Sequence, residues 1–225
     1  MIVNDCVAKS KNFSKPEQIV ILLHGSSGRG EHLLGACNEF FVPNIDNSVF
    51  LMPNGEIKDP GSPENCSWWR EITAKSDEDR AGLDAACPHV KEYVNRMIAE
   101  YGCDKVCLVG FSQGALVAFE MMYLMKISKV ISYCGEFIVP QGKEPVSKPE
   151  CLLVHSDDDP VVRYPEAVRA RKDLMKLGVP VELVTHHNVG HGVSAEGWKI
   201  GAAFLSGARK LTKPCLLRRL FCRGV

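Results

Sequence analysis

One short stretch of the chain constrains its fold most, because it predicts a strand, a tight turn and a buried helix in direct succession. Residues 105–109 read KVCLV, a run typical of a strand that is covered on both faces. Residues 110–114 read GFSQG and match the pattern GxSxG, and residues 114–125 are apolar nearly all round, as a buried helix is. Such a unit lifts Ser112 above the edge of a sheet, so it predicts an α/β protein with an exposed nucleophile.

Short β-branched runs alternate with helical patterns along the rest of the chain. This alternation predicts a mostly parallel central sheet with helices on both faces, and the GxSxG turn makes it an α/β-hydrolase fold in three layers, αβα. Since no repeat or linker occurs, we expect one domain over 1–225, with the last ~12 residues as a candidate tail. The expected strands are 18–23, 49–52, 105–109, 130–134, 151–154 and 181–184. The expected helices are 77–101, 114–125, 164–177 and 195–211. Residues 53–65 are expected to form a long loop.

Composition excludes several classes of partner. Lys+Arg and Asp+Glu number 27 each, so the formal net charge is zero and no basic field attracts nucleic acid. The chain has no run of 18 apolar residues and no secretory signal core, so we expect no membrane insertion. Its ten cysteines are scattered without the CxxC spacing of zinc sites, which favours free thiols, a cytoplasmic protein, and no metal or organic cofactor.

A nucleophilic serine needs a carboxylate and a histidine, and in this fold they follow it along the chain in that order. Three acids follow the strand 151–154 directly, at the end of a strand where catalytic groups of open α/β sheets lie. We expect Asp159 to be the buried acid, because Pro160 fixes the chain that leaves the turn. Asp157 and Asp158 are expected to form the turn.

The predicted base is His191, which lies between two glycines in the loop after the strand 181–184. His186 and His187 are rivals nearby, but their place at the strand end favours a packing or surface role. A histidine is more often structural than catalytic, and the order Ser, Asp, His is what favours His191 here.

The segment HGSSGRG follows the strand 18–23 and predicts a turn that binds an oxyanion. The backbone amides of Ser26 and of Gln113, the residue after the nucleophile, are the expected donors. A phosphate-binding loop is the rival interpretation, but Glu31 follows Gly30 where such a loop has a lysine. The segment also lacks a full GxGxxG pattern, so a dinucleotide site is not expected.

These motifs resemble those of the phospholipase/carboxylesterase family, which includes the acyl-protein thioesterases. The resemblance spans about 18–211 and rests on LLHGSSGRG, CSWWREI, GFSQGA, YCG, HSDDDPVV and VGHGVS. It implies the same nucleophile, acid, base and oxyanion donors as above. The chain departs from the family at Ser27 and Gly28, where GD is usual, and at Arg70 and Glu71, where the family has Phe-Asp. The resemblance places Trp69 and Arg70 near the acyl site, where Arg70 narrows or polarises the pocket; core packing is the alternative for the tryptophans.

The expected function is therefore that of a serine hydrolase that cleaves carboxylic esters or thioesters through an acyl-enzyme, as carboxylesterases, lysophospholipases and acyl-protein thioesterases do. Its expected partner is a small-molecule ester or thioester, with a lipid or an acylated protein among the candidates, and the sequence leaves the oligomeric state open. The alternatives are a noncatalytic binding protein and a peptidase or lactonase on the same fold.

The basic, apolar stretch 216–223 is expected to be an exposed or packed tail, with contact to a membrane surface as the alternative.

Overall fold

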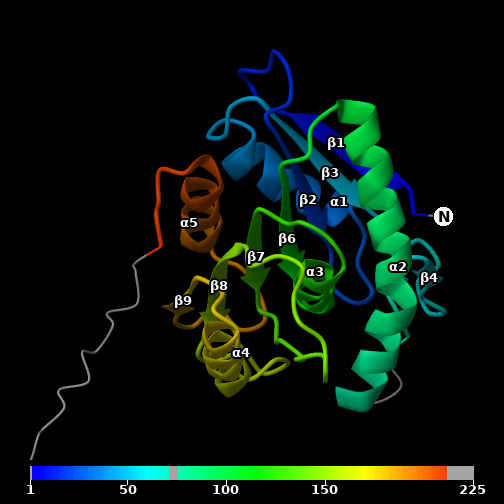
Figure 1. Ribbon diagram of the computed structural model, residues 1–225, viewed down its shortest axis with the longest axis vertical. Coiled ribbons are helices and arrows are strands. Elements are labelled where there is room, and N and C mark those ends of the chain that lie inside the picture. The colour runs from blue at the N-terminus through cyan, green and yellow to red at the C-terminus, as the bar shows by residue number, and fades with distance from the viewer. Residues whose placement is uncertain (1, 71–75, 212–225) are drawn as a thin grey trace, which may run out of the picture.

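A seven-stranded sheet forms the centre of the protein in the computed structural model, which describes residues 2–70 and 76–211 (Figure 1). All neighbouring strands run parallel except at one edge, where the first strand pairs antiparallel. Nearly every residue of the central strands is buried, as expected for strands covered on both faces. From edge to edge the strands are β1 (Asn4–Lys9), β3 (Ser48–Pro53), β2 (Gln18–Leu23), β6 (Val106–Phe111), β7 (Lys129–Tyr133), β8 (Glu150–Ser156) and β9 (Val181–His186).

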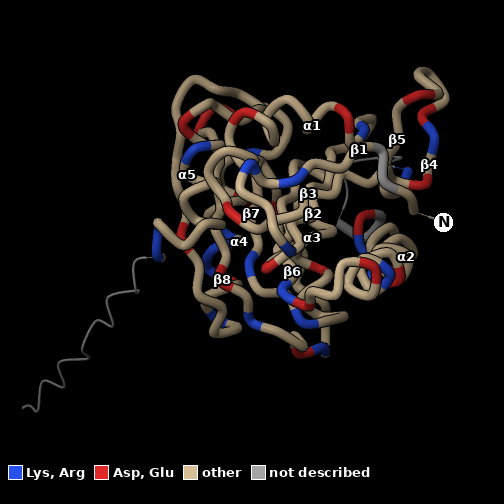
Figure 2. The backbone as a smooth tube through the Cα atoms, turned by 90° about the horizontal axis from the view of Figure 1, so that it is seen from above, with Lys and Arg blue, Asp and Glu red and all other residues tan. Residues whose placement is uncertain are grey.

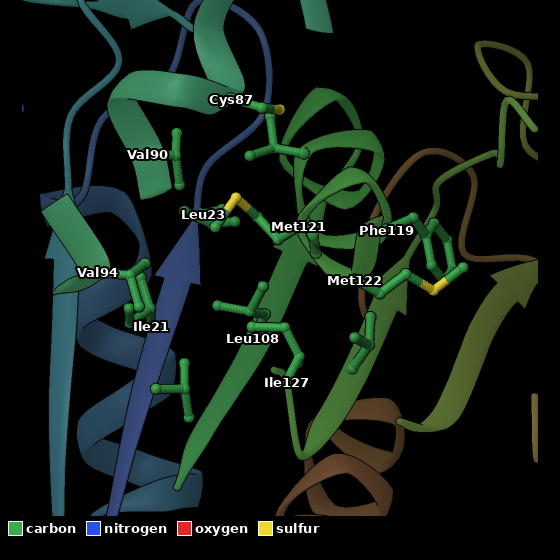
Figure 3. Close-up of a cluster of buried hydrophobic side chains, with 14 of the residues drawn as sticks. Ile21, Leu23, Cys87, Val90, Val94, Leu108, Phe119, Met121, Met122 and Ile127 are labelled. Carbon is green, nitrogen blue, oxygen red and sulfur yellow. The ribbon is translucent and has the colours of Figure 1, made fainter. Parts of the chain in front are cut away.

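Helices cover both faces of this sheet, so the expected three-layer α/β-hydrolase fold is confirmed. Alternate residues of β2 enter two separate cores: Ile21 and Leu23 pack under one set of helices, and Val20 and Leu22 under the other. Figure 3 shows the first core, in which Leu108 of the sheet meets side chains of the covering helices. The helices of the first face are α2 (Ser76–Tyr101), α3 (Gln113–Leu124) and α4 (Tyr164–Lys176); those of the second are α1 (Glu31–Ala36), the π-helix η1 (Cys37–Phe41) and α5 (Ala195–Ser206).

All six expected strands and all four expected helices are present, with bounds that differ by one or two residues except at the end of the last helix. That helix was expected to reach residue 211, but it ends at Ser206 because Gly207 adopts a left-handed conformation with φ +82°. The expected loop 53–65 contains β4 (Ile57–Lys58), which pairs with β5 (Cys66–Ser67) in a short ribbon. The sequence also predicted neither β1 nor the helical segment of α1 and η1.

In the described part of the chain, the charged residues are mixed in sign and the cysteines are free thiols, as the composition predicted. Figure 2 shows acidic and basic residues interspersed over the molecule. The eight cysteines of the described part are free, and seven of them are buried. Cys215, Cys222 and the stretch 216–223 lie outside the described residues. No helix within residues 2–70 and 76–211 is both long and apolar enough to cross a membrane.

A buried ion pair joins α2 to α3. Glu120 lies in the middle of α3 with its side chain only 4% exposed, and Arg80 of α2 donates to it over 2.8 Å. Arg80 also contacts Asp84 of its own helix, at the surface. Because Glu120 has little access to water, the guanidinium is what compensates its charge.

We predict that Arg80→Met lowers the free energy of unfolding by about 2 kcal/mol, less than for a fully buried pair because the arginine is partly exposed. The double variant Arg80→Met, Glu120→Met should recover most of this loss, since no buried charge is then left alone. Denaturant unfolding measures both. Lys143→Met, which removes an exposed pair with Asp84, is the matched control and should cost less than ~0.5 kcal/mol. A double variant as unstable as the single one would contradict the prediction.

Candidate active site

Ser112 occupies a sharp turn between β6 and α3. Its φ of +51° and ψ of −119° lie outside the regions that a residue with a side chain normally adopts. The turn also brings backbone so close that the neighbouring glycines have no room for a side chain. A Cβ on Gly114 would lie 2.2 Å from the carbonyl oxygen of Leu23, and one on Gly110 2.3 Å from the carbonyl oxygen of Gly114. The strand–turn–helix predicted from the sequence is therefore present, and its glycines are sterically required.

His191 and Asp159 lie beside this turn, in the order that the sequence predicted. The Nε2 atom of His191 lies 3.0 Å from Ser112 Oγ, and its Nδ1 atom lies 2.9 Å from Asp159 Oδ2. A carboxylate only accepts, so Nδ1 carries the proton and Nε2 accepts from the serine hydroxyl. The Phe111 ring lies against the imidazole, with centroids 5.1 Å apart. The structure thus brings the three predicted side chains together in one hydrogen-bonded chain.

Asp159 is held in place by the turn that follows it. Its side chain is fully buried, and its Oδ1 accepts hydrogen bonds from the amides of Val161 and Val162 at 2.9 and 3.0 Å. His155 donates from Nε2 to the carbonyl of Val162, and the same atom lies 3.3 Å from Asp159. Buried carboxylates need such donors, because burial without hydrogen bonds penalises the charge.

The turn after β2 is fixed by the side chain of His24. The Nε2 atom of His24 accepts from the amide of Gly55 at 3.0 Å, so its Nδ1 donates to the carbonyl of Gly25 at 2.7 Å. The Trp68 ring stacks on the imidazole, with centroids 5.0 Å apart, and donates to the His24 carbonyl. Ser26, in this turn, is exposed and lines the cleft above Ser112.

Gln113 connects the nucleophile turn to the tryptophan segment. Its side-chain oxygen accepts from the amide of Trp68 at 2.8 Å, and its nitrogen donates to the carbonyl of Trp69 at 3.2 Å. As the first residue of α3, Gln113 has its amide at the helix N-terminus, where the partial charge of the helix is positive. Ser26 and Gln113, the two expected oxyanion donors, thus line the same cleft as Ser112.

Two neighbouring clefts share the lining residues Gly25, Ser26 and Phe111, and Ser112 lines the first of them. The first has a volume of about 310 Å³, and its described lining residues are Gly25, Ser26, Trp69, Asp79, Phe111, Ser112, Gln113, Leu116, Glu136, Val161, Val162 and His191. The second, of about 350 Å³, is lined by the turn 25–28 and also by Leu33, Val193 and Trp198. A larger cavity of about 640 Å³ lies at the opposite ends of β7, β8 and β9, far from this chemistry.

The two residues expected to bind substrate have different surroundings. Trp69 is buried, lines the first cleft and donates from its indole nitrogen to Asp79 at 3.1 Å. Gly82 packs against its ring so closely that any side chain there would clash. Arg70 is exposed and is not among the described residues that line either cleft. Trp68 is a packing residue, as the alternative interpretation of the tryptophans holds.

One group of three side chains in the described part of the chain could ligate a metal ion, and it coincides with the catalytic candidates. Cys134 lies beside Asp159 and His191, with all three donor atoms within 4.8 Å of one another. The thiol of Cys134 donates to the carbonyl of Gly192 at 3.1 Å, and burial raises its pKa to about 12. Two of the three groups already bond to each other, so we assign no metal to the site.

The sequence missed two residues that shape the site. Asp158 was expected only to form a turn, but its carboxylate accepts from the Ser156 hydroxyl and from the amides of Val189 and Gly190, and so anchors the loop that carries His191. Glu136, which lines the first cleft, follows β7 and belongs to no motif found in the sequence.

The two rival histidines have partners other than Ser112. Asp157 pairs with His187 at the surface, and His186 bonds to Ser194, so both histidines lie outside the serine's reach.

Comparison with known proteins gives consistent matches. A family model described as Phospholipase/Carboxylesterase matches residues 4–208. Esterase YpfH of Escherichia coli is 26% identical over 184 residues, covering 80% of this chain and 78% of the relative. Acyl-protein thioesterase 1 of Debaryomyces hansenii is 26% identical over 170 residues, covering 71% and 68%. Among solved structures, esterase PE8 is 25% identical with a TM-score of 0.84, covering 92% of this chain and 98% of that one. Bacillus cereus carboxylesterase shares the fold, at 19% identity and a TM-score of 0.71 over 91% and 93%.

We predict that Asp158→Ala slows the reaction of Ser112 with a fluorophosphonate about tenfold, because the loop no longer holds His191 against the serine. Hydrogen bonds, first of all from the Ser156 hydroxyl, lower the pKa of Asp158. A lowered pKa means that the carboxylate anchor is complete above the usual pKa of an aspartate and is lost only as the pH falls through the lower folded value. The loss should therefore be the same from about pH 5 to pH 9.

Asp157→Ala is the matched control, because the carboxylate of Asp157 pairs with the exposed His187 instead of the loop amides. It should label at the wild-type rate. Equal rates for both variants would mean that the loop is held by other contacts.

Proposed function

The chain belongs to the phospholipase/carboxylesterase family, and we propose that it hydrolyses carboxylic esters or thioesters through a covalent acyl-enzyme on Ser112. One observation carries this proposal: His191 lies between the hydroxyl of Ser112 and the buried carboxylate of Asp159, at hydrogen-bond distance from both. The names of the two curated relatives, an esterase and an acyl-protein thioesterase, support the same class of reaction.

In the first half of the reaction His191 removes the proton of Ser112 as its oxygen attacks the carbonyl carbon of the ester. The C=O π bond opens, the negative charge moves to the carbonyl oxygen, and His191 becomes an imidazolium whose charge Asp159 stabilises. When the carbonyl re-forms, the bond to the leaving oxygen or sulfur breaks. The imidazolium donates its proton to that leaving group, and an acyl-serine ester remains.

In the second half, water takes the place of the alcohol or thiol. His191 accepts a proton from water, the hydroxide attacks the acyl-serine, and the acid leaves as Ser112 recovers its proton. The amides of Ser26 and Gln113 are the proposed donors to the oxyanion in both halves. An oxyanion donor of this kind contributes about 2.7–4 kcal/mol to the stability of the transition state.

The proposed site handles the two sides of the ester bond in separate spaces. Trp69 and Leu116 line the first cleft together with Ser112, and Leu33 and Trp198 line the second; Phe111, next to Ser112 in the chain, lines both. Volumes of about 310 and 350 Å³ lie at the lower end of small-molecule sites, which hold ligands in about 300–1,000 Å³. They support a compact ester or a short to medium acyl chain as substrate.

We predict that Ser112→Ala lowers kcat for p-nitrophenyl acetate by at least about a thousandfold, because no acyl-enzyme can form. Asp159→Asn should retain the fold and also lose most activity, because its amide no longer selects the reactive tautomer of His191.

Across a series of p-nitrophenyl esters from acetate to palmitate, the rate of nitrophenolate release should peak at short or medium acyl chains.

Mass spectrometry of the fluorophosphonate adduct provides a second measurement of the same proposal. The label should fall on Ser112 in the wild type and be absent from Ser112→Ala. Ester turnover that persists in Ser112→Ala, or the absence of both turnover and label in the wild type, would overturn the proposal.

A further inference from the structure

Cys134 lies at the exit of β7, the strand between those that lead to Ser112 and to Asp159. In the sheet order β6, β7, β8, β9, the serine follows β6, the aspartate follows β8 and His191 follows β9. Side chains at the carboxyl ends of neighbouring parallel strands meet at one edge of the sheet. The exit of β7 is therefore a central position on this edge, close to the groups that follow β8 and β9.

The backbone around Cys134 is held by both neighbouring strands. Its φ of +51° lies in a region that residues with a side chain rarely adopt. Its amide donates to the carbonyl of Val154 at 3.1 Å, and the carbonyl of Tyr133 before it accepts from the amide of Ser112 at 2.9 Å. A Cβ on Gly135 would lie 2.3 Å from a side-chain atom of α3. Backbone packing thus fixes where the side chain of Cys134 points.

The thiol of Cys134 contacts the loop that carries His191. It is fully buried and donates to the carbonyl of Gly192, the residue after the histidine, at 3.1 Å. Its sulfur also lies within 4.8 Å of a donor atom of Asp159 and of one of His191. Burial first, and then the charge of Asp159, raises the pKa of the thiol to about 12. The thiol therefore keeps its proton at neutral pH and remains a hydrogen-bond donor.

We infer that Cys134 is a positioning residue for the proposed reaction, because its thiol holds the loop of His191 on one side of the histidine while Asp158 holds it on the other. Asp158 accepts from the two amides before the histidine, and Cys134 donates to the carbonyl after it. Catalytic side chains must be held within about 0.5 Å of the productive geometry, and an anchor on each side restricts the imidazole more than one anchor does. The inference rests on the proposed function, since it concerns how the base of that reaction is held against Ser112.

The first test compares Cys134→Ala with Cys134→Ser. Alanine and serine are both smaller than cysteine, but only serine keeps a donor for the carbonyl of Gly192. With p-nitrophenyl acetate, kcat should fall about tenfold in Cys134→Ala and stay within about twofold of the wild type in Cys134→Ser. KM should change little in either variant, because Cys134 is not among the described residues that line either cleft.

Cys151→Ala is the matched control. Cys151 is also fully buried, and its thiol donates to the carbonyl of Pro149 at 3.5 Å, but it lies at the start of β8, at the end of the strand away from the site. Both alanine variants should lower the midpoint of denaturant unfolding, because each removes a buried sulfur. Only Cys134→Ala should lower kcat. An equal loss of kcat in Cys134→Ser and Cys134→Ala, or in the two alanine variants, would assign the effect to packing and overturn the inference.

Hydrogen exchange tests the same contact without any substrate. The amide of Gly190 donates to Asp158, and that of Gly192 donates to the carbonyl of Gly190 at 3.0 Å, so their exchange measures how well the loop is held. Mass spectrometry of peptides that cover 187–194 should show exchange about tenfold faster in Cys134→Ala, and at the wild-type rate in Cys134→Ser. Unchanged exchange in Cys134→Ala would mean that the thiol does not hold the loop, which also overturns the inference.

Failure of this inference can be told from failure of the proposed function. If the wild type hydrolyses esters and Cys134→Ala matches its kcat, the hydrolase stands and the positioning role is overturned. If the wild type neither hydrolyses esters nor reacts with the fluorophosphonate, the proposed function fails. Hydrogen exchange then decides alone whether Cys134 holds the loop.

Discussion

The close approach of α3 to the end of β2 is the contact on which the rest of the site depends. At Gly114 the first turn of the helix lies so near the carbonyl of Leu23 that no side chain fits between them. This contact holds the strained turn at Ser112 next to the turn that starts at His24. The nucleophile and the proposed oxyanion donors are therefore set by backbone packing, which is more rigid than any arrangement of side chains alone.

A second layer of contacts keeps this arrangement from relaxing. Gln113 bonds to the backbone of Trp68 and Trp69, while Trp68 stacks on His24 and bonds to its carbonyl. Each of these groups is buried, so breaking one bond leaves a polar atom without a partner in a dry environment. The strain at Ser112 persists because several such contacts would have to break together.

Much of this could be predicted from the sequence, for reasons that can be named. The buried strands read as apolar runs, and the turn at Ser112 combines a sterically required glycine pattern with a strand before it and a helix after it. The strand β1 escaped prediction because it lies at the sheet edge, where Val7 faces solvent and the apolar run is broken by alternation. The role of Asp158 also escaped, because its partners are loop amides some 30 residues away, and an amide has no sequence signature.

The charged side chains near the site are a second example of what the sequence does not predict. The resemblance placed Arg70 near the acyl site, as a side chain that narrows or polarises the pocket. In the structure Arg70 is exposed and is not among the described residues that line either cleft, as expected for a long side chain that lowers its free energy by reaching water. Shorter carboxylates such as Asp79 are held by local hydrogen bonds and remain where the backbone sets them. Which charged side chains line the cleft thus depends on which of them can reach water instead, and neither net charge nor proximity in sequence records that difference.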